Sequence, residues 1–280
     1  MLGSFAEAED AVQETWLRLN RTGVDGIENL GGWLTTVTAR ICLNMLRTRE
    51  TRREEPLDTG TRTGTGDGVR IPDPVVSDPS GIDPEQQVLL ADSVGLALLV
   101  VLESLSPAER VAFVLHDMFA VPFDEIAPLI ERTSAATRQL ASRARRRVQG
   151  QAPSPDPDPI RQREVVDAFF AASRDGAFDA LVAVLHPDVV LRSDGGPERA
   201  GQTVVLNGAH TVASQAATYR RMAPFVRPAL INGAAGAVVA ANGIPLSVMA
   251  FTVSDGLIVA IDVIVDPDRL RTLDLSAALG

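Results

Sequence analysis

Two stretches rich in proline and glycine interrupt this chain of 280 residues, and they limit how much of it can fold into packed domains. Residues 54–83, with the proline that follows, contain five prolines and five glycines among threonine and aspartate. Such a composition leaves too little apolar surface to offset the entropy of ordering, so we expect a flexible linker. Residues 150–159 carry proline at every second position from 153 onward, which favours a short polyproline II spacer. Three folded pieces remain, at 1–53, 84–149 and 160–280.

The first piece has the apolar spacing of two helices. Over residues 6–19, Val12, Trp16 and Leu19 share one helical face. Over residues 33–53, apolar residues four apart begin at Trp33, and five arginines follow in the second half. The arginines predict either a solvated helix end or a contact with the phosphate backbone or separated strands of DNA.

The second piece has the pattern of four helices, which we expect at 84–105, 107–119, 123–130 and 134–149. Residues 83–86 and 106–109 each resemble a capping box with proline at the first helical position. The last two helices are joined by a short turn, and the second of them is basic. This arrangement is typical of a helix-turn-helix motif.

The basic helix carries the strongest signal in the chain. Residues 132–149 hold six arginines and no acid, a local charge of +6 in a chain whose net charge is −10. Leu140, Ala144 and Val148 share one face, and most of the arginines point elsewhere. A planar guanidinium can pair with guanine edges or grip phosphate. The pattern favours insertion into the major groove of DNA over a merely solvated amphipathic helix.

The third piece changes character and predicts an α+β domain with one covered sheet face. Asn242-Gly243 and Asp255-Gly256 are strong turn signals between strands. The expected helices lie at 160–175, 178–185 and 209–222, and the expected strands at 188–193, 226–231, 237–241, 246–253 and 257–265.

Composition excludes several classes of protein. No uninterrupted apolar run approaches the roughly 20 residues of a membrane span, and the N-terminus lacks the pattern of a signal peptide. The lone Cys42 rules out a disulfide framework and a cysteine-based metal site, and the three histidines form no cluster. We therefore expect a soluble, cytoplasmic protein with no metal, no cofactor and no membrane partner.

Longer motifs carry a resemblance to a known family. Residues 6–19 (AEAEDAVQETWLRL) resemble region 2.2 of extracytoplasmic-function sigma factors, and residues 32–47 (GWLTTVTARICLNMLR) resemble their region 2.3–2.4 helix. Residues 105–119 (LSPAERVAFVLHDMF), 123–127 (FDEIA) and 136–145 (ATRQLASRAR) are similar to region 4. Residues 160–280 are similar to a SnoaL-like domain of the NTF2 superfamily. That pairing is the SigJ-like subgroup, in which a DGGGK-like loop and an NPDKL-like motif occur.

The resemblance implies a multidomain fold with two all-α domains, a partial sigma region 2 and a region 4 helix-turn-helix, followed by an α+β NTF2-like cone. The family carries a region 2.1 helix before this point of the chain. Either the true start lies upstream of Met1, or the first domain lacks this packing helix, which would leave Val12 and Trp16 exposed. The usual lysine of the loop is replaced here by Pro197-Glu198.

The resemblance also implies an alternative sigma factor that binds RNA polymerase core and directs initiation at −35 and −10 promoter elements. The core contact, through the β′ and β subunits, would involve Asp10, Gln13 and Glu14. The −10 element would meet Trp33, Arg40, Asn44 and Arg47. The −35 element would meet Ser134, Arg138, Gln139, Ser142, Arg143, Arg145 and Arg146.

The C-terminal domain would then regulate the factor in cis, by an intramolecular contact with the linker or with regions 2 and 4. The residues implied are those of the two subgroup motifs: Asp194, Gly195, Gly196, Asp266, Pro267, Asp268, Arg269 and Leu270.

Two other functions stay open. One is a helix-turn-helix repressor whose C-terminal domain binds a ligand; the other is a polyketide-cyclase-like enzyme with a DNA-binding appendage. Acid–base chemistry needs a carboxylate or histidine in an apolar cavity. The candidates are Asp194, His186, His210, Tyr219 and Asp262, each of which has an ordinary structural explanation, such as a turn at His186 or a solvent-facing edge strand at Asp262.

Overall fold

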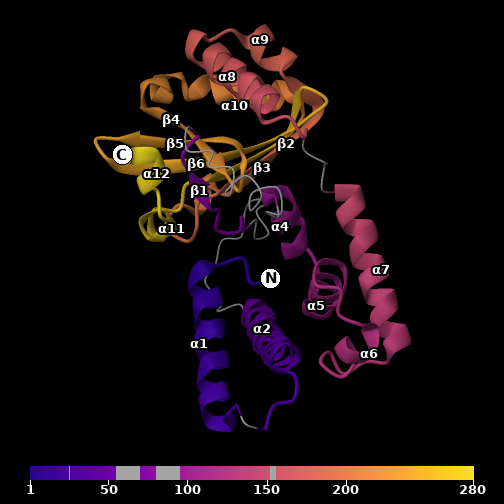
Figure 1. The fold of residues 1–280 in the computed structure, drawn as a ribbon. Coiled ribbons are helices and arrows are strands. Elements are labelled where there is room, and N and C mark those ends of the chain that lie inside the picture. The colour runs from indigo at the N-terminus through magenta and orange to yellow at the C-terminus, as the bar shows by residue number, and fades with distance from the viewer. Residues whose placement is uncertain (25, 55–69, 80–94, 152–155) are drawn as a thin grey trace. The chain divides into compact units, whose positions relative to one another are not determined.

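The computed structural model describes residues 1–24, 26–54, 70–79, 95–151 and 156–280, and the chain forms two compact units (Figure 1). One unit comprises Met1–Thr63 and Val101–Gln151, and the other Gly64–Val100 and Ala152–Gly280. The expected capping box at 83–86 and much of the expected linker lie outside the described residues. Of the helix expected at 84–105, the described part is α4 (Leu96–Glu103), within which the two units divide.

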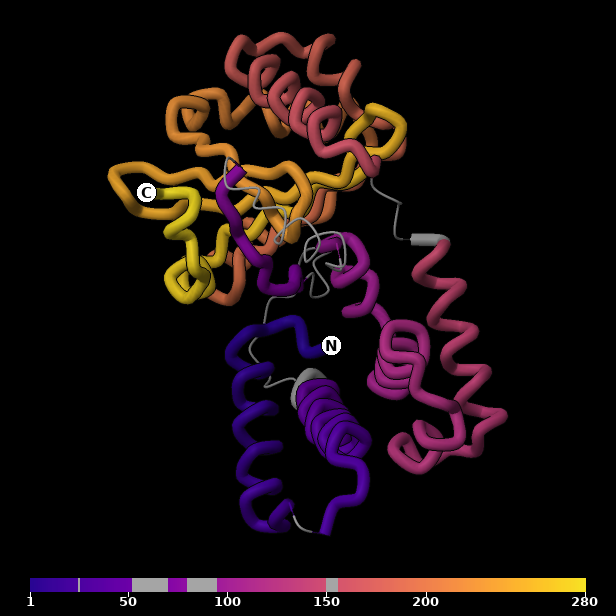
Figure 2. The backbone as a smooth tube through the Cα atoms, in the orientation of Figure 1, coloured from indigo at the N-terminus to yellow at the C-terminus, as the bar shows by residue number. Residues whose placement is uncertain are grey.

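The first unit is helical, as its periodicity predicts. Figure 2 shows its first two helices lying side by side. Its elements are α1 (Phe5–Thr22), α2 (Leu30–Glu54), α5 (Pro107–Phe113), the π-helical turn η1 (Val114–Met118), α6 (Phe123–Ile126) and α7 (Ser134–Gln151).

The capping box at the start of α5 is confirmed. The Ser106 side chain accepts a hydrogen bond from the Glu109 amide, and the Glu109 carboxylate accepts one from the Ser106 amide at 3.2 Å. This reciprocal pair satisfies two backbone donors that would otherwise be unpaired at a helix start.

Helix α2 and the helical segments of residues 107–151 share one hydrophobic core. Ala39 and Leu43 of α2 pack with Val111 and Leu115 from the α5–η1 segment and with Ile126 of α6. A second cluster joins α1 and α2. Helix α5 therefore packs on α2, and α6 and α7 join the same core through their contacts with α5 and with each other.

A buried ionic network adds to this core. Glu103 of α4 pairs with Arg110 at 2.9 Å and with Arg49 of α2 at 3.5 Å. Arg110 also donates to the Met1 carbonyl oxygen at 2.9 Å, and Arg49 to the Leu2 carbonyl oxygen at 2.9 Å. The sequence leaves Arg49 open between a solvated helix end and a contact with DNA, but the structure turns it inward, toward Glu7, Glu103 and the Leu2 carbonyl oxygen.

The second unit is built on a seven-stranded sheet with the order β1-β4-β5-β6-β7-β2-β3. Its neighbours are antiparallel except β2 and β7, which are parallel. The strands are β1 (Val76–Ser77), β2 (Leu185–Asp194), β3 (Val204–Asn207), β4 (Val226–Ile231), β5 (Ala234–Ala241), β6 (Ile244–Ser254) and β7 (Leu257–Ile264).

The hairpin turns follow their local chemistry. Asn242 and Asp255 have φ of 52°, and the glycine after each has φ of 77°, the left-handed conformations that a two-residue turn requires. Asn232-Gly233 makes a third turn of the same kind between β4 and β5.

Helices cover the sheet on both faces, where the sequence predicts one covered face. Helices α8 (Pro159–Asp175), α9 (Phe178–Ala183) and α10 (Ala209–Thr218) lie over one face around Phe169, Phe251 and Ile261 (Figure 1). The opposite core contains Ile264 from β7 together with Ile71, Leu96, Leu270 and Leu275. The short turns η2 (Ala200–Gln202) and η3 (Arg220–Phe225) and the helices α11 (Pro267–Thr272) and α12 (Ser276–Leu279) complete the unit.

Part of the segment expected to be a flexible linker is therefore ordered. Ile71 is fully buried against the sheet, and β1 pairs with β4 and so forms the edge of the sheet. The Val75 amide donates to the Asn232 side chain at 2.7 Å, and the Asn232 amide donates to the Val75 carbonyl at 2.8 Å. The proline-rich composition does not predict that this segment is ordered. The strand that β1 pairs with, and most of the core that covers Ile71, come from residues more than a hundred positions away.

None of the described helices is long and apolar enough to cross a bilayer.

Candidate functional sites

The helix α7 forms because its start is capped and its inner face is apolar. Thr133 accepts a hydrogen bond from the Ala136 amide at 3.2 Å, and Thr137, Ala141 and Ala144 are buried. The turn before it contains Glu131 at φ 57°, a conformation that favours glycine but tolerates a polar residue. The outer face carries the exposed side chains of Arg138, Gln139, Arg143 and Arg146, with Ser134, Ser142 and Arg145 half-buried.

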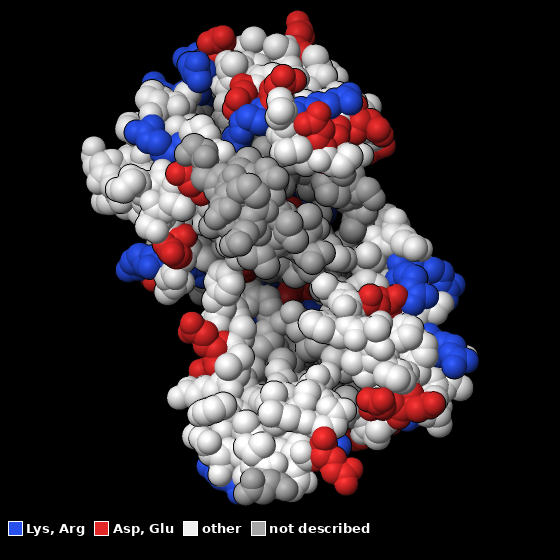
Figure 3. Space-filling model, in the orientation of Figure 1, with Lys and Arg blue, Asp and Glu red and all other residues white. Residues whose placement is uncertain are grey.

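Several arginines of α7 are paired with acids of the preceding helices. Asp117 accepts two hydrogen bonds from Arg145, at 2.8 Å to Nε and 2.5 Å to Nη2. Glu109 lies 3.6 Å from Arg143 and 3.8 Å from Arg147. Figure 3 shows blue and red side chains side by side along α7. The basic face is thus partly neutralised by its own chain.

Arg138 and Ser134 are held differently. The Arg138 guanidinium lies over the Phe123 ring, 5.5 Å from its centroid, and Ser134 donates to the Asp124 carboxylate. Both contacts orient the first two turns of α7 against α6.

The structure brings the four residues implied at the −10 element onto one stripe of α2. Arg40 and Asn44 are exposed, while Trp33 and Arg47 are half-buried. Arg47 lies 3.7 Å from Glu131 of the turn before α7. The spacing of seven, four and three residues keeps these side chains on one helical face.

On α1, Asp10 and Gln13 are exposed and Glu14 pairs with Arg18 at 2.9 Å. Beside them Val12 and Trp16 are 65% and 61% exposed. Ala11, Thr15 and Leu19 form the buried face instead.

The two subgroup motifs of the C-terminal domain meet at one ionic site, which we call the clasp: Asp194, Arg269, Ile71 and Asp73. Arg269 donates to the Asp194 carboxylate at 2.6 Å and to Asp73 at 2.9 and 2.6 Å. It also donates to the Ile71 carbonyl oxygen at 2.5 Å, and the Ile71 amide donates to Asp194 at 3.0 Å. The side chains of Arg269, Asp73 and Asp194 are 13%, 12% and 8% exposed.

The N-terminal cap of α11 positions Arg269 in the clasp. Asp266 caps α11 by accepting hydrogen bonds from the Asp268 amide at 2.9 Å and the Arg269 amide at 3.4 Å. Pro267 occupies the first helical turn, and Leu270 is buried beneath it. The cap fixes the start of α11 and so aims Arg269 at Asp194.

The glycines after Asp194 are required by close approach. Gly196 has φ of 61°, and a Cβ there would lie 2.0 Å from the Asp266 carboxylate. A Cβ at Gly195 would lie 2.1 Å from the Arg199 carbonyl oxygen. The Gly195 amide donates to Thr203 and the Gly196 amide to Asp194, which fold the loop back on itself.

The acid–base candidates do not converge. His186 Nδ1 accepts from the Asp188 amide within β2, His210 lies beside Phe178, and Tyr219 is 55% exposed. Asp194 belongs to the clasp. Asp262 is 2% exposed on the inner strand β7, so the expectation of a solvent-facing edge position does not hold.

The negative charge of the buried Asp262 carboxylate is compensated by one arginine. Its carboxylate accepts a hydrogen bond from Arg192 on the neighbouring strand at 2.9 Å. Burial raises the pKa of Asp262 above its ordinary value, and Arg192 partly opposes the rise. Burial likewise raises the pKa of the Cys42 thiol, which disfavours the thiolate.

Comparison with known proteins identifies the two helical regions. Residues 1–52 match the family described as Sigma-70 region 2, and residues 95–148 match Sigma-70, region 4. A probable ECF RNA polymerase sigma factor SigI of Mycobacterium tuberculosis is 36% identical over 284 residues, covering 98% of this chain and 89% of that protein. The ECF RNA polymerase sigma factor SigJ of M. tuberculosis H37Rv is 39% identical, covering 96% of this chain and 87% of that protein.

This chain belongs to the ECF RNA polymerase sigma factors.

The fold agrees over the whole length of this sigma factor. The crystal structure of M. tuberculosis SigJ superposes with a TM-score of 0.72 at 36% identity, covering 98% of this chain and 92% of that one. The expected order of folds is confirmed: two sigma-type helical regions, then an α+β domain.

Sequence reasoning identified Asp194 and Arg269 but missed their partners, Ile71 and Asp73. One available signal was Ile71 itself, a large apolar residue between Arg70 and Pro72 in a segment with little other reason to hold one. The roles of Glu103, Asp117 and Glu109 as ion-pair partners were also missed. An isolated acid in a helical pattern gives no indication of which arginine it will meet.

Proposed function

We propose that this alternative sigma factor is regulated in cis by its C-terminal domain, which fastens residues 70–79 through the clasp. The observation that supports this is Arg269, whose guanidinium donates to Asp194 of the domain and to Asp73 of the segment at once. One side chain therefore connects the domain to the chain between sigma regions 2 and 4.

The clasp has a physical consequence for how far regions 2 and 4 can separate. A chain extends by at most about 3.4 Å per residue, so the number of free residues between two regions limits how far they can separate. Fastening residues 70–79 to the sheet removes them from the free length between α2 and α4. We infer that the clasp limits how regions 2 and 4 adjust their spacing to a promoter.

For promoter recognition we propose the contacts that the resemblance implies. The exposed face of α7 would read the −35 element, the Trp33–Arg47 stripe of α2 would meet the −10 element, and Asp10, Gln13 and Glu14 of α1 would bind polymerase core through β′. Support comes from the exposure of Arg138, Arg143 and Arg146 on a helix whose opposite face is packed.

The clasp is tested by promoter-dependent transcription with purified polymerase core. Arg269→Gln removes the shared cation, and Arg271→Gln on the same helix is a matched control, since Arg271 pairs with the exposed Asp268. We expect transcription to rise at least about threefold for Arg269→Gln, because the connection gains free length, and to stay unchanged for Arg271→Gln. Equal transcription from both variants would contradict the proposal, as would unchanged output after deletion of residues 160–280.

The α+β domain acts in this proposal as a structural part and not as a catalyst. Its three buried carboxylates all have structural partners: Asp194 and Asp262 accept hydrogen bonds from arginine, and Asp266 accepts them from the backbone amides that begin α11. The alternatives predict different behaviour: a repressor would not bind polymerase core and would protect a palindrome, and an enzyme would turn over a ligand.

A further inference from the structure

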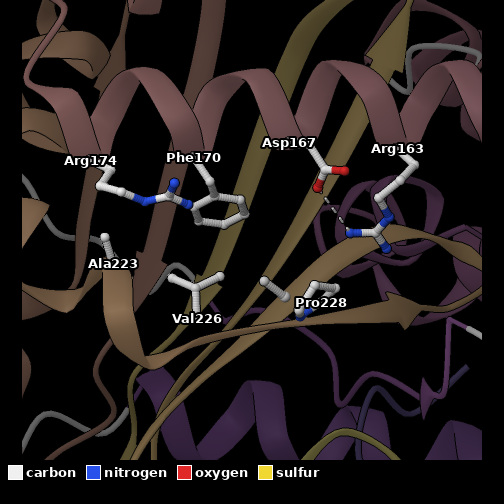
Figure 4. Close-up of a pocket in the computed structure, with 8 residues that line it drawn as sticks. Arg163, Asp167, Phe170, Arg174, Ala223, Val226 and Pro228 are labelled. Carbon is white, nitrogen blue, oxygen red and sulfur yellow. Dashed lines mark ion pairs between the residues drawn. The ribbon is translucent and has the colours of Figure 1, made fainter.

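A cavity of about 170 Å³ lies between α8, η3 and the strands β4 and β5, away from the clasp. Figure 4 shows Arg174 and Phe170 reaching from α8 toward it, with Val226 and Ala223 on the opposite side. Pro228 and Ala237 complete the apolar part of the wall. None of the expected acid–base residues lines this cavity.

One end of the cavity is polar and fixed. Arg163 donates to the backbone carbonyl oxygens of Gly236 at 3.1 Å and Ala229 at 2.7 Å, which holds its guanidinium against the sheet. Asp167 lies 3.9 Å from it, at the limit of an ion pair, and its side chain is 59% exposed. This end therefore offers a carboxylate with free acceptor positions beside an anchored cation.

The other end carries an uncompensated cation. Arg174 is exposed and forms no ion pair or hydrogen bond with any residue in the described parts of the chain. It follows Phe170 by four positions, so both side chains emerge from the same stripe of α8. An apolar wall with a free guanidinium at its edge suits a ligand that has an apolar body and one negative charge.

We propose that this cavity binds a small carboxylic acid with a ring-sized apolar body. Its carboxylate pairs with Arg174, its body lies against Phe170, Val226 and Ala223, and a distal hydroxyl donates to Asp167. Burial lowers the pKa of Arg163, whose guanidinium is held against the sheet beside Asp167. The site gives this sigma factor a place to sense a metabolite independently of the clasp.

The test uses the full chain and four probes: benzoate, 4-hydroxybenzoate, 3-phenylpropionate and the neutral benzyl alcohol. Titration followed by NMR should give a dissociation constant for benzoate in the millimolar range or tighter, as a ligand of its size allows. We expect 4-hydroxybenzoate to bind more tightly than benzoate, and benzyl alcohol to bind at least about tenfold more weakly because it lacks the charge.

Two variants locate the site. Arg174→Gln should weaken benzoate about tenfold and leave benzyl alcohol unchanged, and Ala223→Leu should weaken every probe by filling the cavity. The matched control is Arg220→Gln, an exposed arginine of η3 outside the lining. The proposal is overturned if no probe binds, if Arg174→Gln and Arg220→Gln weaken benzoate equally, or if Ala223→Leu has no effect while the variant keeps the far-UV circular dichroism of the parent.

Discussion

At the scale of single residues, the arginines of α7 are less free than their sequence indicates. Asp117 holds Arg145 by two hydrogen bonds, and Glu109 approaches Arg143 and Arg147. A phosphate that binds Arg145 must compete with a carboxylate already in place. If α7 binds DNA as we propose, Asp117 acts as an internal counterion that lowers nonspecific affinity.

Asp117→Asn should raise the affinity of the full chain for duplex DNA about three- to tenfold, because Arg145 gains a free charge. The salt dependence of binding should steepen by about one unit in the slope of log K against log salt, the effect of one further phosphate contact. Fluorescence anisotropy over a salt series measures both quantities. Asp175→Asn, which removes an equal charge from α8, is the control, and an equal effect there would attribute the change to net charge alone.

A second residue, Asp262, gives a pH dependence whose sign is fixed by its burial. Because its pKa is raised in the folded chain, the folded state keeps a proton that the unfolded state has lost above the ordinary value of 3.8. The stability that it contributes is therefore complete below about pH 4 and is lost as pH rises through the folded pKa.

Comparison with Asp262→Asn isolates this contribution from the other acids. The free energy of unfolding of the α+β domain, followed by amide exchange of β7 in urea, should fall more between pH 4 and pH 7 for the parent than for the variant. A parent and variant with parallel pH profiles would show that Asp262 titrates normally.

At the scale of elements, the turns and helices were the most predictable parts of this sigma factor. The capping box at Ser106 and the turns at Asn242 and Asp255 depend on a few adjacent residues, so the sequence places them well. Elements whose partners are distant were missed, as β1 and β3 were. Val76 and Ser77 become a strand only because β4 offers an edge.

The burial of both faces of the sheet explains why the environment of Asp262 was predicted wrongly. Alternation in β7 identifies which residues share a face but cannot indicate that the second face is also covered. Asp262 therefore looked like a solvent-facing residue, although Arg192 and the second core enclose it.

The packing of α2 on region 4 depends on Glu103, which serves two arginines. Glu103→Gln would leave the buried Arg110 without its anion, while Arg49 keeps its pair with Glu7, and should destabilise the helical unit by about 3 kcal/mol, the typical cost of breaking a buried pair. Trp16 and Trp33 both lie in this unit, so tryptophan fluorescence during urea unfolding reports it.

Glu50→Gln on the exposed side of α2 supplies the comparison, and we expect it to change stability by less than about 0.5 kcal/mol. Similar unfolding of the two variants would mean that the shared apolar core alone holds α2 to α5.

At the scale of the whole molecule, the distribution of charge along the chain bears on which partners it binds. The segment 132–149 carries +6, which leaves −16 on the rest of the chain. Such an acidic remainder opposes nonspecific DNA binding and favours binding that depends on the polymerase. The average charge thus says little about the partner, and the distribution of charge says much more.

The candidate sites differ in whether residues that are close in the sequence are enough to predict them. The stripes of α2 and α7 that we propose to face DNA lie on helices whose periodicity and arginine content are visible in the sequence, and the resemblance to a family supplied their roles. The clasp requires that residues 71, 73, 194 and 269 come together, and no local pattern contains that information. The resemblance to a family pointed to Asp194 and Arg269, and the structure supplied the segment they hold.

The central claim is that Arg269 fastens residues 70–79 to the C-terminal domain, and hydrogen–deuterium exchange of that segment in the full chain tests it most directly. We predict slow exchange of the Ile71 and Val75 amides in the parent and in Arg271→Gln, because both amides donate to groups of the domain. In Arg269→Gln exchange of the segment should accelerate at least about tenfold. Fast exchange in the parent, or protection that survives Arg269→Gln, would contradict the account.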